Sequence, residues 1–136
     1  MNDREHITSV LFLIVGDNFE PEVITKAIGI KPDRSWKKGD KETLPKGSVH
    51  TYSNSGWKKF QDPELDQQCL ERQISYFIGL LSAKSEELKE LKDKGLSLEL
   101  NCFICSSIGL SFCITNEVLS DLHRLSLDLS FDFEQY

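Results

Sequence analysis

The sequence lacks an apolar stretch long enough for a signal peptide or a membrane span. Its first apolar run, residues 10–15, is only six residues long, whereas a membrane helix needs about 20. No internal repeat, linker or low-complexity segment occurs either. We therefore expect one domain over residues 1–136, with no membrane association and with the cytoplasm as the default location.

Motifs for catalysis and metal binding are also absent. The three histidines are far apart in the sequence and lack metal-ligand spacing. No HExxH, GxSxG or P-loop motif is present. The sequence therefore offers no catalytic residue, no metal ligand and no cofactor site, and it favours a protein without enzymatic activity. A site assembled only in the folded chain would escape this search, so a small enzyme or sensor with an unrecognised pocket stays an alternative.

The sequence contains four cysteines, two of which have CxxC spacing. Cys102 and Cys105 invite a zinc or redox interpretation. However, residues 96–105 alternate between apolar and polar side chains, as a strand does. Residues three apart on a strand point to opposite faces, so the two sulfurs would diverge. We expect free thiols and no bound metal.

The apolar periodicity predicts the element order β-α-β-α-β-β-α-β. The predicted strands are residues 7–15, about 49–54, 96–105, 110–114 and 127–133. The predicted helices are residues 21–28, 63–81 with a continuation over 85–94, and 115–125. The first strand is apolar on nearly every position, which is typical of a central strand covered on both faces.

The last predicted strand has the strictest alternation in the chain. Its odd-numbered side chains are Leu127, Leu129, Phe131 and Phe133, and its even-numbered ones are Asp128, Ser130, Asp132 and Glu134. One face is therefore expected to be buried and the other to be wet. Such strands favour a mostly antiparallel sheet with helices packed on one side, an α+β two-layer sandwich.

A long irregular segment, residues 30–49, carries an unusual mixture of tryptophan and lysine. Residues 31–59 hold eight basic and three acidic side chains, although the whole chain has a net charge of −6. The candidate binding residues here are Trp36, Lys37, Lys38, Asp40, Trp57 and Lys58. Tryptophan and cations are common interface anchors. The structural alternative is that Trp36 pins the loop to the domain and Asp40 caps a turn, while Trp57 fits either role.

Residues 19–32, followed by Trp36-Lys-Lys-Gly-Asp40 and by Trp57, resemble the bacterial domain-of-unknown-function family 4279. In that family a helix ends in Ile-Thr-x-x-Leu-Gly-Ile-x-Pro, and Trp-x-Lys-Gly-Asp or Glu follows. Ile28 stands where the family usually has leucine. The resemblance covers nearly the whole chain. It implies no established activity, but family members are similar to bacterial immunity proteins in size and occurrence.

Two binding functions follow as hypotheses. The first is a non-enzymatic protein-binding domain, in its most specific form an immunity protein that masks a bacterial toxin. Acidic residues on the wet face of the sheet are candidate contacts for a basic toxin: Glu99, Asp128 and Asp132. The alternative is a nucleic-acid or anionic-ligand binder that uses the basic tryptophan loop. The net charge of −6 counts against that alternative. Neither the partner's identity nor the oligomeric state follows from the sequence.

Overall fold

A five-stranded sheet organises the protein in the computed structural model, which describes residues 6–107 and 109–135. The strand order is β2-β5-β1-β6-β7. All neighbouring pairs are antiparallel except β6 and β7, which are parallel. The mostly antiparallel sheet is therefore confirmed. The strands are β1 (His6–Gly16), β2 (Arg34–Trp36), β5 (Ser55–Phe60), β6 (Ser97–Ser106) and β7 (Asp128–Gln135).

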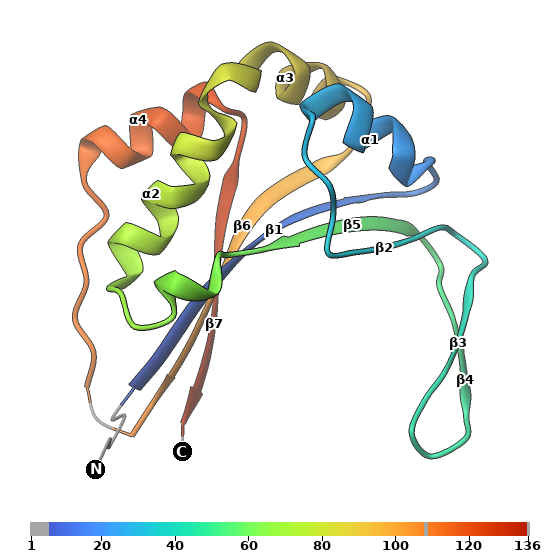
Figure 1. Ribbon diagram of the computed structural model, residues 1–136, viewed down its shortest axis with the longest axis horizontal. Coiled ribbons are helices and arrows are strands. Elements are labelled where there is room, and N and C mark those ends of the chain that lie inside the picture. Colours follow the sequence, from blue (N-terminus) through green and yellow to red (C-terminus); the bar gives the residue numbers. More distant parts are fainter. Residues whose placement is uncertain (1–5, 108, 136) are drawn as a thin grey trace.

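The helices lie together on one side of this sheet, which gives the predicted two-layer α+β arrangement (Figure 1). They are α1 (Pro21–Ile28), α2 (Leu70–Leu81), α3 (Ser85–Asp93) and α4 (Asn116–Arg124), with 3-10 turns η1 (Pro63–Leu65) and η2 (Ser82–Lys84). Gly29 ends α1 at a φ of 71°, and its N–H donates to Thr25 O at 2.8 Å, as expected of a left-handed cap. No described helix is long and apolar enough to cross a membrane.

The core lies between the helices and the helix-facing side of the sheet. β1 contributes Val10, Phe12 and Ile14, all essentially inaccessible to solvent. On its other face, Leu11 and Leu13 are only half-buried. The central position of β1 is confirmed, but the described helices cover only one of its two faces.

A two-stranded hairpin replaces much of the predicted irregular segment. It consists of β3 (Lys41–Thr43) and β4 (Val49–Thr51) and projects from the side of the sheet that the helices leave open (Figure 1). The strand predicted over residues 49–54 is confirmed only for residues 49–51. The chain instead forms β4 in the hairpin and then β5 in the main sheet, because the turn at residues 52–54 returns it to β1.

Two further boundaries differ from the sequence prediction. Residues 110–114 do not join the sheet. Their alternation is real, since Leu110, Phe112 and Ile114 pack against the core, but they do so as an extended segment. The helix predicted from residue 63 begins at Leu70, because Leu65 O accepts from Gln68 N at 2.9 Å and closes a separate turn.

The odd- and even-numbered side chains of β7 point to opposite faces as predicted, but the burial of the odd-numbered ones decreases along the strand. Leu127, just before β7, is 6% exposed, Leu129 and Phe131 are half-buried, and Phe133 is 66% exposed. The prediction that all the odd-numbered side chains are buried is therefore wrong at Phe133. No described strand lies beyond β7, so its last residues have a neighbour on one side only.

Candidate protein-binding surface

The side of the sheet that faces away from the helices is called the open face here. The strand registers define it: it carries the odd-numbered side chains of β1 and β6 and the even-numbered side chains of β2, β5 and β7. The centre of the open face is apolar. Leu11 lies between Phe60 of β5 and Asn101 of β6, and Leu13 lies between Lys58 and Glu99. Phe60 is 48% exposed.

This apolar centre is unusual for an uncovered sheet face. Antiparallel sheets with one solvated face normally alternate between apolar side chains toward the core and polar ones toward water. β1 instead presents Ile7, Leu11, Leu13 and Val15 to the open face, with Ser9 as the single exception among the odd-numbered residues from 7 to 15. Partly exposed apolar side chains that lie side by side are typical of a surface that contacts another molecule.

An acidic group borders the apolar centre on β6 and β7. Glu99 and Asp128 are neighbours in the register, and Asp132 lies two residues further along β7. The amide of Asn101 joins the group, because its Nδ2 donates to Ser130 Oγ at 2.9 Å and to Asp132 Oδ2 at 3.0 Å. Ser130 Oγ in turn donates to the Glu99 carboxylate. The fold thus brings together the three acidic residues expected on the wet face.

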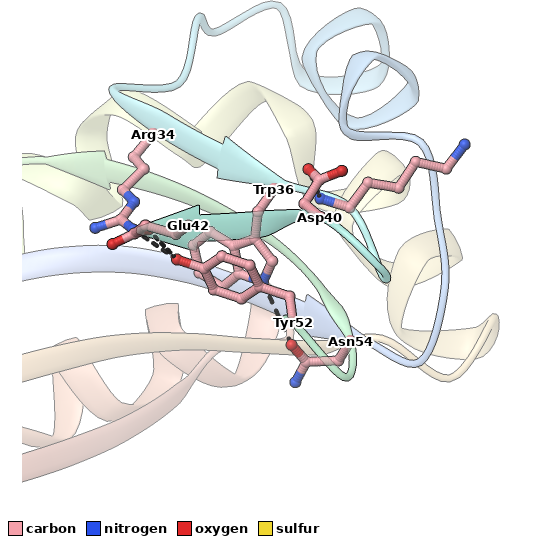
Figure 2. A network of polar contacts seen from close by, with 7 residues as sticks. Arg34, Trp36, Asp40, Glu42, Tyr52 and Asn54 are labelled. Carbon is pink, nitrogen blue, oxygen red and sulfur yellow. Dashed lines mark hydrogen bonds and ion pairs between the residues drawn. The ribbon is translucent and has the colours of Figure 1, made fainter. Parts of the chain in front are cut away.

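Trp36 lies on the open face against the backbone of β5. A Cβ placed on Gly56 would come within 2.0 Å of Trp36 Cζ2, so only glycine leaves room for the indole. The indole also stacks on Tyr52, with ring centroids 5.1 Å apart, and its Nε1 donates to Asn54 Oδ1 at 3.3 Å (Figure 2). Lys58 Nζ lies 5.4 Å from the ring centroid. These contacts support the structural alternative for Trp36, an anchor for its loop.

A polar triad attaches the β3–β4 hairpin to the sheet. Arg34 on β2 pairs with Glu42 on β3 and donates to Tyr52 OH at 2.6 Å, while Tyr52 OH donates to Glu42 Oε1 at 2.7 Å (Figure 2). The hydrogen bond from Tyr52, together with the charge of Arg34, lowers the pKa of Glu42. The same bond to Glu42 raises the pKa of Tyr52. The triad therefore fixes the base of a hairpin that would be marginally stable alone.

The basic segment is partly neutralised by nearby carboxylates. Three of its lysines form ion pairs: Lys37 with Glu20, Lys38 with Asp17 at 3.5 Å and Lys59 with Asp33 at 3.6 Å. The hydrogen bond to Glu20 is the main cause of a raised pKa at Lys37. Asp40 Oδ2 accepts from Lys37 N at 2.8 Å, which is the turn-capping role expected as the structural alternative.

Trp57 is a core residue. Its side chain is 0% exposed, its Nε1 donates to Thr25 Oγ1 at 3.1 Å, and its ring packs edge-on against Phe12. Of the two roles left open for Trp57, the structure supports the structural one. Its neighbour Lys58 points to the open face, as expected for the next residue of a strand.

Sequence reasoning missed the apolar centre as a candidate site. The signal was present in the run of residues 10–15, which was interpreted only as a doubly covered strand. Tyr52, Glu42 and Arg34 were missed as a group, because the contact between β2 and the hairpin joins residues up to 18 positions apart. Such pairings depend on tertiary structure and leave no local periodicity.

The described residues show no arrangement typical of a metal site. Within residues 6–107 and 109–135, no three His, Cys, Asp or Glu side chains gather in a way that could hold an ion. Cys102 is buried beneath the helices and Cys105 lies on the open face, so the predicted divergence of the CxxC pair is confirmed. Burial raises the pKa of the Cys102 thiol to about 12.

Comparison with known proteins identifies the family. A family model described as "Domain of unknown function (DUF4279)" matches residues 5–136. The chain belongs to this family. The DUF4279 match includes α1, the Trp36 loop and the terminal strands, and it confirms the resemblance found in the sequence. No curated protein and no solved structure matches the chain significantly.

Proposed function

We propose that this DUF4279 domain is a non-catalytic protein-binding domain that docks a basic protein on its open face. The observation that carries the proposal is the composition of β1, which is apolar on both faces although helices cover only one. Covering Leu11, Leu13 and Phe60 would remove apolar surface from water, which is the main favourable term in protein association.

The charge of the open face specifies the partner's chemistry. Glu99, Asp128 and Asp132 border the apolar centre, and the whole chain has a net charge of −6. A second copy of this chain would bring a further acidic surface against the first, whereas a basic protein would be complementary. Complementary charge accelerates association and makes it sensitive to salt.

In its most specific form, the proposal is that the partner is a basic bacterial toxin and that the domain masks it in the cytoplasm. The acidic border supports this form, as does the similarity of family members to bacterial immunity proteins in size and occurrence. The ion pairs of Lys37 and Lys38 favour a protein partner over nucleic acid, because paired lysines have less charge available for phosphate.

Co-expression with the product of the neighbouring gene, followed by affinity capture at low and moderate salt, tests the proposal. We expect a stoichiometric complex that weakens as salt rises. Leu11→Asp, on the open face, should abolish the complex. Leu119→Asp is the matched control, because Leu119 lies on α4 and is 49% exposed. Circular dichroism should show that both variants are folded.

Two results would contradict the proposal. One is equal loss of the complex in Leu11→Asp and Leu119→Asp, which would show that the open face has no special role. The other is the absence of a complex with the neighbouring gene product, together with tight binding of single-stranded nucleic acid that Lys37→Glu and Lys38→Glu abolish. That second result would show that the protein binds nucleic acid through the basic loop.

A further inference from the structure

The outer edge of β7 carries backbone groups that pair with no other described strand. β7 is the last strand of the sheet, spans eight residues and has no described strand beyond it. The opposite edge is different, because β2 contains only three residues. Proteins usually shorten, cover or charge such edges, since an exposed strand is a template for pairing with another chain.

The two faces of β7 differ in chemistry along this edge. Its open-face side carries Asp128, Asp132 and Glu134. Its helix-facing side ends in Phe133, which is 66% exposed although its register neighbour Ile104 is 2% exposed.

An aromatic row leads to the exposed Phe133. Phe131 stacks on Phe112 at 5.6 Å and on Phe133 at 6.0 Å, so the three rings form a continuous series. Phe112 and Phe131 are half-buried, and exposure rises only at the last ring. A further strand beside β7 would place side chains next to Phe131 and Phe133. It would supply the neighbour that the outer side of β7 lacks.

We propose that the edge of β7 binds an extended segment of the basic partner by strand addition. Basic side chains of that segment lie beside Asp128, Asp132 and Glu134, and its alternate, apolar side chains lie beside Phe131 and Phe133. Backbone hydrogen bonds supply affinity in this binding mode, and the alternate side chains supply specificity.

The acidic side chains of β7 also disfavour pairing with a strand that is itself acidic. Pairing β7 with β7 of a second copy would place carboxylates of the two strands close together, and like charges on adjacent strands are destabilising. A basic strand experiences attraction at the same positions. The basic character of the partner rests on the proposed function. Strand addition at β7 is a separate claim, and the experiment below can refute it without refuting the proposed function.

The test uses a synthetic peptide of about seven residues that alternates lysine with valine or threonine, matched to the length of β7. Three controls accompany it: a scrambled peptide of the same composition, a glutamate-for-lysine peptide, and a peptide with alternate backbone nitrogens methylated. We expect the alternating peptide to bind the intact protein. Methylation should weaken binding at least about tenfold, because it removes two or more backbone hydrogen bonds.

Variants of the protein locate the binding edge. Asp128→Lys and Glu134→Lys should each weaken binding of the alternating peptide. Glu90→Lys makes the same charge change on α3 at an exposed position and should have little effect. Leu11→Asp should leave peptide binding unchanged, because Leu11 lies on the central strand and not on the edge.

Two outcomes would overturn strand addition: no binding of the alternating peptide, or equal binding of the scrambled or methylated peptide. Peptide binding in the absence of any complex with the neighbouring gene product would contradict the proposed function alone. A complex that is lost in Leu11→Asp but is insensitive to Glu134→Lys would contradict strand addition alone.

Discussion

Replacing Gly56 with alanine tests the contact that positions Trp36. The new Cβ would lie 2.0, 2.3 and 2.5 Å from Trp36 Cζ2, Cε2 and Cη2, so the indole must move. Overpacking of this kind costs about 1–3 kcal/mol, and loss of the stacking on Tyr52 adds about 1 kcal/mol. Reduced entropy of the unfolded chain offsets roughly 0.5–1 kcal/mol. We expect Gly56→Ala to lower the free energy of unfolding by about 1–3.5 kcal/mol.

Urea unfolding followed by circular dichroism measures this loss. Gly79→Ala is the matched control, because no side chain lies within 4 Å of the added methyl group. It should stabilise α2 by about 0.5–1 kcal/mol. In a protein that already carries Trp36→Ala, Gly56→Ala should hardly change the free energy of unfolding, because the indole that the added methyl group would contact is absent. An equal loss of stability from Gly56→Ala in the presence and absence of Trp36 would show that the indole does not oppose the added methyl group.

Three other predictions follow from burial. In urea unfolding, Leu100→Ala should cost about 2–5 kcal/mol and Leu129→Ala about 1–2 kcal/mol, because Leu100 is fully buried and Leu129 half-buried; equal costs would contradict the assigned packing. The raised pKa of Cys102 means that the unfolded thiol ionises first, so stability should fall by about 1.4 kcal/mol per pH unit between pH 9 and pH 12 relative to Cys102→Ala. If the free energies of unfolding of the wild-type protein and of Cys102→Ala changed equally with pH, the Cys102 thiol would not have the raised pKa. Trp36→Phe should retain blue-shifted fluorescence from the buried Trp57, and a red-shifted maximum would contradict its burial.

The sequence predicted the elements whose periodicity reflects burial. β1, β6 and β7 were found because alternation or continuous apolarity directly records which faces are covered. α1 was found because Pro21 and Gly29 mark its ends. The segment 110–114 has the alternation of a strand, but packing alone produces that pattern, and backbone pairing with a neighbour depends on the rest of the fold.

The candidate site was only partly predictable for the same reason. Glu99, Asp128 and Asp132 could be placed on one face from alternation, and the parallel register of β6 and β7 then brought them together. Trp36 was singled out by composition, but its close contact with Gly56 joins two strands that are paired only in the folded sheet. The open apolar centre required knowledge that helices cover one face alone.

Docking on the open face can be measured by calorimetric titration of the purified neighbouring gene product into this protein. We expect equimolar binding with a negative heat-capacity change, because apolar surface is buried. Binding should be lost in Leu11→Asp and kept in Leu119→Asp. Undiminished binding by folded Leu11→Asp would contradict docking on the open face.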